Sequence, residues 1–175
     1  MTLLAYQLSI TDITAHLVAV ELRFTPQSSD SIQLSLPSWI PGSYMVRDFA
    51  KHLHSIEAFD DAGVLMVQQL DKQSWQLNHN QHPLTVRYKV YAFDLSVRGC
   101  YLDDQLAILN PAALCLEVKG MEAEPINLTV VTPECLDWQV ATGLTRGRTT
   151  QPLHFGLYHA DNYQQLIDTP LMLGK

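Results

Sequence analysis

The chain has 175 residues, of which 47% are hydrophobic and 17% charged, a composition that fits a globular protein and excludes a disordered one. The formal net charge is -7 and the basic residues do not cluster, so nucleic acid is not expected as a partner. No run approaches the ~20 consecutive apolar residues that a membrane span needs, so no membrane is expected either.

The sequence predicts a cytoplasmic protein. The first ten residues, MTLLAYQLSI, carry neither a positive n-region nor a small-residue cleavage site, so they do not read as a signal peptide. Cys100, Cys115 and Cys135 are odd in number and widely spaced, which argues against a disulfide framework or a zinc knuckle. Cys115 lies in an apolar run and is expected to be a buried, reduced thiol.

The first predicted strands alternate apolar and polar residues. In residues 16–24 two valines, a leucine and a phenylalanine share one face, which is typical of a strand with one buried side. The turn-rich segment PQSSDS leads into a second alternating strand at residues 31–36. We expect these two strands to form a hairpin.

Residues 36–53, LPSWIPGSYMVRDFAKHL, form the most unusual stretch of the chain. Its two prolines exclude a central strand, and its Pro-Gly pair predicts a sharp turn. Trp39 and Tyr44 bring large apolar rings with a polar tip. Arg47 and Asp48 place two opposite charges in this otherwise apolar motif.

The remaining predicted elements are mostly short strands separated by turns. They are residues 52–59, 64–70, 74–77, 84–93, 113–118 and 126–131, with a turn at residues 60–63. One short helix is predicted at residues 161–168, capped by Asp161 and stopped by a Thr-Pro pair. The pattern predicts an all-β chain, folded as an antiparallel β-sandwich-like domain with one short C-terminal helix.

Two motifs resemble the N-terminal region of the peptidase M61 family, the glycyl aminopeptidase-like metalloproteases that often end in a PDZ domain. They are WIPGSYMVRDFAKHL at residues 39–53 and SVRGCYLDDQLAILNPAALCLEV at residues 96–118. WQVATGL and the terminal YHADNYQQLIDTPLMLGK follow in the same order. The resemblance implies that residues 1–175 form a single non-catalytic N-terminal β domain of a longer protease, without its catalytic zinc domain and PDZ domain.

The resemblance also implies what this chain lacks. The zinc-binding H-E-x-x-H helix of the family lies further downstream and is absent from these residues. We therefore expect no cofactor in this chain and zinc in the parent protein, where a metal-bound water would attack the peptide carbonyl. The expected partners are the missing catalytic domain of the same chain and the peptide substrate of the parent.

No catalytic or metal site is predicted within the chain itself. His52 with His54, and His79 with His82, have spacings that two ligands can use, but no carboxylate or cysteine stands at ligand spacing beside them. There is no G-x-S-x-G elbow and no phosphate-binding glycine loop.

Asp103 and Asp104 allow two interpretations. As neighbouring carboxylates they are candidates for an acid–base pair, which would make the chain a small hydrolase. The structural interpretation, which we prefer, is a turn with one aspartate bonded to backbone amides and the other paired with an arginine.

Charges set among aromatic residues give the candidate functional surface, because arginine and aromatic residues are typical interface anchors. Its members are Trp39, Tyr44, Arg47, Asp48, Arg98, Tyr101, Asp103 and Asp104. The functional interpretation is a docking surface for a catalytic domain that forms one wall of the substrate cleft. The structural interpretation is a corner where two sheets meet, held by an internal Arg–Asp pair.

Two further expectations bear on this surface. Either Arg47 or Asp48 should pair within the domain, or they should lie on an exposed face rimmed by Trp39 and Tyr44. The alternative function is a stand-alone carbohydrate- or peptide-binding β-sandwich that uses Trp39, Tyr44 and Tyr101 as exposed aromatic contacts.

Overall fold

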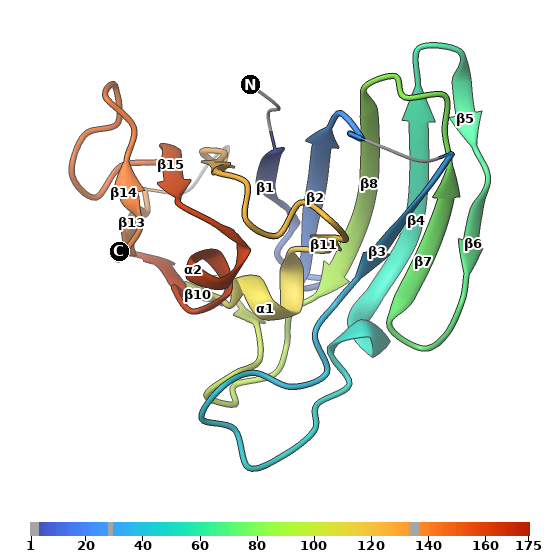
Figure 1. Cartoon of the computed structure of the whole chain (residues 1–175). Helices are drawn as coiled ribbons and strands as arrows, with labels where there is room; N and C mark the ends of the chain where they lie inside the picture. Colours follow the sequence, from blue (N-terminus) through green and yellow to red (C-terminus); the bar gives the residue numbers. More distant parts are fainter. Residues whose placement is uncertain (1–3, 28–29, 134–136) are drawn as a thin grey trace.

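The computed structural model describes residues 4–27, 30–133 and 137–175, and strands dominate it, as the sequence predicts (Figure 1). The largest sheet has eight strands in the order β14-β15-β12-β1-β2-β8-β4-β5. These strands are Thr145–Arg146, Gly156–Ala160, Ile126–Val130, Leu4–Asp12, Leu17–Phe24, Leu84–Tyr91, Leu53–Asp60 and Gly63–Leu65. Neighbouring strands are antiparallel except β1 and β12, which are parallel.

Two four-stranded sheets complete the fold. One has the order β13-β16-β10-β9, with strands Gln139–Thr142, Leu171–Gly174, Leu106–Leu109 and Tyr101–Leu102. The other has the order β11-β3-β7-β6, with strands Glu117–Val118, Ser31–Ser35, Ser74–Asn78 and Val67–Gln69. Three short helices connect the sheets: η1 (Phe49–His52), α1 (Pro111–Leu114) and α2 (Tyr163–Ile167). None of the described helices is long and apolar enough to cross a membrane.

All three sheets contribute to one buried apolar cluster. The period-two pattern sets this up, because the alternate residues Val18, Val20, Leu22 and Phe24 of β2 are all at most 2% exposed. The same alternation buries one face of β8, as the sequence predicts. The other face of the large sheet carries charged residues such as Arg87.

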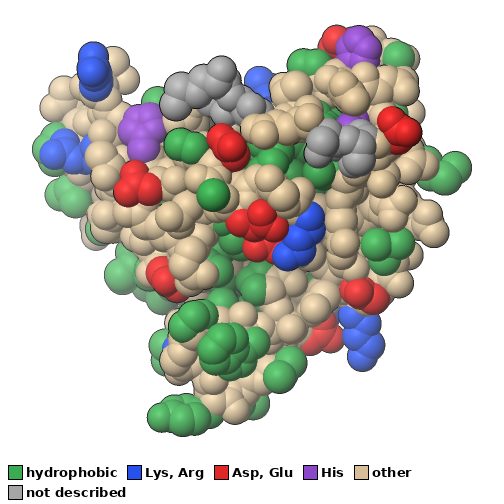
Figure 2. Space-filling model, in the orientation of Figure 1, with side chains coloured by type: hydrophobic (Ala, Val, Ile, Leu, Met, Phe, Trp, Pro, Cys, Tyr) green, Lys and Arg blue, Asp and Glu red, His purple; other side chains and the backbone are tan. Residues whose placement is uncertain are grey.

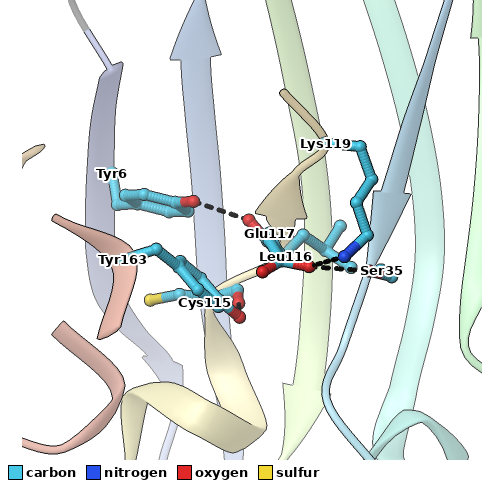
Figure 3. A network of polar contacts seen from close by, with 7 residues as sticks. All are labelled: Tyr6, Ser35, Cys115, Leu116, Glu117, Lys119 and Tyr163. Carbon is cyan, nitrogen blue, oxygen red and sulfur yellow. Dashed lines mark hydrogen bonds and ion pairs between the residues drawn. The ribbon is translucent and has the colours of Figure 1, made fainter. Parts of the chain in front are cut away.

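Three tyrosines stabilise the segment between α1 and β11, which crosses the core without regular structure. Tyr163 and Tyr6 donate hydrogen bonds to the carbonyl oxygens of Cys115 and Leu116, at 2.7 and 2.5 Å (Figure 3). Tyr88 donates to the carbonyl oxygen of Leu114, the last residue of α1, at 2.7 Å. The hydroxyl of Tyr88 also accepts from the amide of Leu116 at 3.1 Å. Burial raises the pKa of all three tyrosines, so their hydroxyls stay protonated donors at neutral pH.

The described cysteines are free and buried, as expected for Cys115. Burial raises the pKa of the Cys100 thiol to about 12 and raises that of Cys115 as well. Neither is therefore a reactive thiolate at neutral pH. Cys135 lies outside the described residues.

The predicted hairpin between the first two strands is wrong. β2 pairs with β1 and β8, whereas β3 belongs to a different sheet and pairs with β7 and β11. A turn-rich segment shows that the chain reverses, but it does not choose the partner of the strand that follows. Ser28 and Ser29 of that segment lie outside the described residues.

The predicted strand at residues 113–118 is also wrong over most of its length. Residues up to Leu114 form α1, whose first residue is Pro111 and whose cap is Asn110, and β11 covers only Glu117–Val118. The Asn110 side chain accepts from the amide of Ala112 at 3.2 Å. An asparagine followed by proline is a helix-start signal, and it overrides the apolar run that suggested a strand.

The C-terminal helix is present but is capped differently. α2 begins at Tyr163, and the side chain of Asn162, not that of Asp161, accepts from the amide of Gln165 at 2.9 Å. The predicted apolar stripe of Tyr163, Leu166 and Ile167 is buried as expected.

Other boundaries shift by smaller amounts. The predicted strand at residues 64–70 is broken at Met66 into β5 and β6, and the strand predicted from residue 52 begins at Leu53, after η1. The turn at residues 60–63 is confirmed, since Asp60 pairs with Gly63 across it.

Candidate functional site

Two long loops project together from one end of the molecule, at the bottom of Figure 1. Loop A, residues 37–48, connects β3 to η1, and loop B, residues 92–100, connects β8 to β9. We call them the paired loops. They contain Trp39, Tyr44, Arg47, Asp48 and Arg98 of the predicted surface.

Arginine side chains join the paired loops. The guanidinium of Arg98 donates to the carbonyl oxygens of Gly42 at 2.9 Å and Pro41 at 3.4 Å. Arg47 reaches back from loop A to the hydroxyl of Ser96, at 3.4 Å. Gly42 has a φ of 77°, which lets the turn present its carbonyl to Arg98 without the strain of a side chain.

The paired loops are not held together by the internal Arg–Asp pair of the structural interpretation. Within the residues that the structure describes, no ion pair involves Arg47, Asp48 or Arg98. The expected internal Arg–Asp pair is therefore wrong. The loops are held by arginine contacts to carbonyl and hydroxyl oxygens, since the turn leaves its own carbonyls without strand partners.

Loop A is also braced internally. Its tryptophan, Trp39, donates from the indole N–H to the carbonyl of Ser43 at 2.8 Å. The Ser43 hydroxyl donates to the carbonyl of Met45 at 2.9 Å, and the amide of Arg47 donates to the carbonyl of Ser38 at 2.6 Å. These bonds close the loop on itself and brace its tip.

Loop B is braced around Asp94. Its amide donates to the carbonyl of Cys100 at 2.9 Å, and its carboxylate accepts from the amide of Ser96 at 3.0 Å. Gly99 packs so closely that an added Cβ would fall 2.6 Å from the carbonyl oxygen of Asp94. Any larger residue at position 99 would have to shift the backbone of this loop.

The paired loops expose a set of large apolar side chains that the core does not use. They are Trp39 (52% exposed), Tyr44 (106%), Met45 (63%), Val46 (77%), Phe93 (48%), Leu95 (70%) and Val97 (94%). Hydrophobic side chains accordingly gather at the lower end of the face shown in Figure 2. A braced, contiguous apolar surface of this kind is typical of an interaction site.

Tyr101 and Asp103 lie at the base of loop B and serve its structure. The ring of Tyr101 stacks on Phe93, with centroids 5.2 Å apart, and its hydroxyl donates to Asp103 at 2.9 Å. The other carboxylate oxygen of Asp103 accepts from the amides of Gln105 at 2.8 Å and Leu106 at 2.9 Å. These backbone hydrogen bonds lower the pKa of Asp103.

This geometry agrees with the first half of the structural interpretation of the Asp103–Asp104 pair and not with the second. Asp103 closes a turn through backbone amides, as preferred. Asp104 is exposed, and no arginine in the described part of the chain pairs with it. One oxygen of Asp103 is occupied by turn amides and the other by the Tyr101 hydroxyl, so the pair does not have the arrangement of an acid–base site.

Sequence reasoning missed the part of the surface that loop B supplies. Phe93, Leu95 and Val97 alternate directly after a strand, and residue 93 was expected to continue that strand. It also missed His16, whose ring stacks on Phe93 at 4.0 Å and whose Nδ1 lies 2.6 Å from the carbonyl of Leu102. In loop B, polar and charged residues alternate with apolar ones. The same alternation occurs in a half-buried strand, so the sequence pattern does not distinguish the two.

Residues 5–175 match the model of the peptidase M61 N-terminal domain. The chain belongs to this family. It also matches the crystal structure of an aminopeptidase N family protein from Idiomarina loihiensis, with 42% identity and a TM-score of 0.94. That match covers 99% of this chain and 29% of the Idiomarina chain. A search of curated protein sequences with the present chain found no match.

The fold of this M61 N-terminal domain also occurs in a more distant enzyme. Two crystal structures of a mutant M1 zinc metallopeptidase from Deinococcus radiodurans match with TM-scores of 0.57 and 0.58, the latter bound to a Tyr-Ser-Ala substrate. Identity is 11%, and the match covers 98% of this chain and 41% of theirs. At this identity the likeness shows the fold alone.

The histidines of this M61 N-terminal domain do not converge. Among residues 4–27, 30–133 and 137–175, no three His, Cys, Asp or Glu side chains are close enough to hold a metal ion together. His54 is exposed on β4, while His52 ends η1 and packs against Tyr91, so the two histidines lie on different elements. These residues do not fit a catalytic zinc site, which needs three protein ligands.

Proposed function

We propose that this chain is the non-catalytic N-terminal domain of a zinc-dependent M61 aminopeptidase, and that its paired loops pack against the catalytic domain and form one wall of the substrate cleft. The observation that carries the proposal is the braced apolar surface of the paired loops. The family membership supports it, as does the share of the Idiomarina chain that this domain spans, 29%. The remaining length of such a protein has room for a catalytic domain.

The paired loops suit a permanent contact inside one protein. Complete burial of one large apolar side chain stabilises a contact by about 1.5–3 kcal/mol, and loop A alone exposes four such side chains. Because hydrogen bonds already hold both loops, docking orders few new torsions and loses little conformational entropy. Tyr44, whose side chain is fully exposed, is our candidate for a cleft-facing residue.

Zinc belongs to the partner domain in this proposal. There the metal would supply a polarised water for attack on the peptide carbonyl. The residues of this chain would position that domain and exclude water along one side of its cleft. A cytoplasmic location, supported by the two free buried thiols, and a PDZ domain further along the parent chain complete the proposal.

The non-catalytic part of the proposal is tested on the purified chain. We expect less than one zinc per ten molecules by metal analysis and no hydrolysis of glycyl substrates, with the full-length parent enzyme as the positive control. Chelator-sensitive hydrolysis by residues 1–175 alone would overturn the proposal.

The docking part is tested by hydrogen exchange. Amide exchange of residues 39–47 and 93–99 should be at least tenfold slower in the full-length parent than in the isolated chain, because docking excludes water from these loops. Residues 61–63, in the exposed turn between β4 and β5, serve as an internal control and should exchange equally in both. Equal exchange of the paired loops in both proteins would remove the catalytic domain as their partner.

One observation favours the alternative of a stand-alone carbohydrate- or peptide-binding module. Trp39 borders a hollow of about 360 Å³ that is also lined by Asp71, Glu117 and Lys119, a combination of an indole with polar groups that suits a sugar. Binding of glycans to the isolated chain that Trp39→Ala abolishes would support it. A reading frame that continues past Lys175 into an H-E-x-x-H motif favours the protease domain.

A further inference from the structure

We propose that Arg47 binds a carboxylate of the catalytic domain when the paired loops dock, so that the apolar contact surrounds one interdomain ion pair. The inference rests on the proposed function and adds the chemistry of the partner surface: an apolar face that carries an aspartate or glutamate opposite Arg47.

Arg47 is a half-buried arginine whose donors are largely without partners among the described residues. A guanidinium has five N–H donors, yet this one makes a single side-chain contact, the 3.4 Å contact to Ser96. Its Nε is buried and has no hydrogen-bond partner within the described residues. No carboxylate among them forms an ion pair with it.

The other arginines show that this is particular to Arg47. Arg23 and Arg87 both pair with Glu21, and Arg98 donates to two carbonyl oxygens of loop A. Arg146 and Arg148 are exposed, so water satisfies them. Arg47 alone combines partial burial with missing partners.

Docking would increase the free-energy cost of the unpaired Arg47 charge unless the partner supplies an anion. Met45 and Val46 precede it in loop A and are both more than 60% exposed, so their burial would remove the water around the guanidinium. A buried charge without a partner costs several kcal/mol. A carboxylate corrects this through two parallel N–H···O bonds, the geometry for which arginine is suited.

The geometry also predicts a movement of the side chain. Because Nε is closed off from solvent in the isolated domain, the guanidinium must turn for Nε to meet a partner. The contact to Ser96 is long and is easily exchanged for a charge-assisted bond.

The test uses the full-length parent with Arg47→Met, which keeps length and apolar contact, and Arg47→Lys, which keeps charge. Arg146→Met, an exposed arginine on β14, is the matched control. We expect Arg47→Met to speed amide exchange in residues 39–47 and 93–99 about tenfold, Arg47→Lys to have a smaller effect, and Arg146→Met to have none.

The isolated chain supplies the folding control. There Arg47→Met should leave the midpoint of thermal unfolding unchanged or raise it, because it removes a buried donor without a partner. This result, together with the loss of protection in the parent, would assign the effect of Arg47 to docking.

The outcomes separate the two proposals. A wild-type parent without protected loops would remove the proposed function itself. Protected loops in the wild type and equally protected loops in Arg47→Met would remove only the interdomain ion pair. Protection that depends on Arg47 only after a peptide with a free C-terminal carboxylate is added would assign Arg47 to substrate and overturn the inference.

Discussion

Tyr88 makes two of the hydrogen bonds that stabilise the segment crossing the core. Its hydroxyl donates to the carbonyl of Leu114 and accepts from the amide of Leu116. Both backbone groups are buried and have no strand partner, so they depend on this side chain. One phenol oxygen thus satisfies two backbone groups that would otherwise lack a hydrogen-bond partner.

The phenylalanine variant isolates this role. Tyr88→Phe keeps the ring and leaves two backbone groups unsatisfied, and each such group costs about 1–3 kcal/mol. We expect a clear loss in the free energy of unfolding by urea denaturation. Tyr91→Phe changes an exposed tyrosine of the same strand and should stay within about 0.5 kcal/mol of the wild type. Equal effects of the two variants would contradict the role of Tyr88.

Asp103 couples stability to acid. Its backbone hydrogen bonds lower its pKa below the usual 3.8, so the folded state holds the proton less tightly than the unfolded state. The stability that it contributes is present above pH 3.8 and is lost as pH falls through the lower folded pKa. Asp103→Asn keeps an acceptor oxygen but cannot ionise. We expect the urea midpoint of the wild type to fall more steeply than that of Asp103→Asn between about pH 4 and pH 2, and parallel curves would contradict this.

At the scale of elements, the paired loops act as one unit because Arg98 crosses between them. Its backbone carbonyl accepts from the buried side chain of Asn110 at 3.1 Å, and that side chain also caps α1. The contact continues through the guanidinium of Arg98 to the turn at Gly42. The position of loop A therefore depends on a helix cap far away in the sequence.

Removal of this connection should loosen loop A without unfolding the domain. In the isolated chain, we expect Arg98→Ala to increase amide exchange in residues 40–46 several-fold, while global stability changes by about 1 kcal/mol or less, as for a partly exposed hydrogen bond. Arg148→Ala, on an exposed turn, is the control. Unchanged exchange in loop A would show that its internal hydrogen bonds suffice.

Sequence patterns predict some of these elements and not others. Alternation located β2 and β8 because one face of each is buried, and the M61 motif located loop A by its composition. Alternation could not pair the strands, because β3 has the same pattern whichever sheet it joins. It did not locate the short strands of the β13-β16-β10-β9 sheet, whose positions depend on tertiary contacts. β1 does carry the alternation, with Leu4, Tyr6 and Leu8 buried, but the sequence was read there only for a signal peptide. The absence of carboxylate partners for Arg47 is a spatial fact with no counterpart in the sequence.

At the scale of the whole molecule, the three sheets share one apolar cluster, so they should unfold together. Leu128, at the middle of β12, is fully buried between β15 and β1. Leu128→Ala should cost about 2–5 kcal/mol. Within each protein, wild type or variant, circular dichroism and tryptophan fluorescence should give the same urea midpoint, and the midpoint of the variant should be lower. Separate midpoints would indicate that the sheets form independent units.

The parallel pairing of β1 with β12 has a consequence for synthesis of the chain. β1 leaves the ribosome well before β12, so one of its hydrogen-bonding edges has no partner until Ile126–Val130 has been made. At elongation rates of about 5–20 residues per second, that interval is on the order of 10 s. During it the nascent chain presents an open strand edge with apolar neighbours, which is a substrate for chaperones and a starting point for aggregation. The open edge of β1 is thus covered only after β12, in the last third of the domain, has been synthesised.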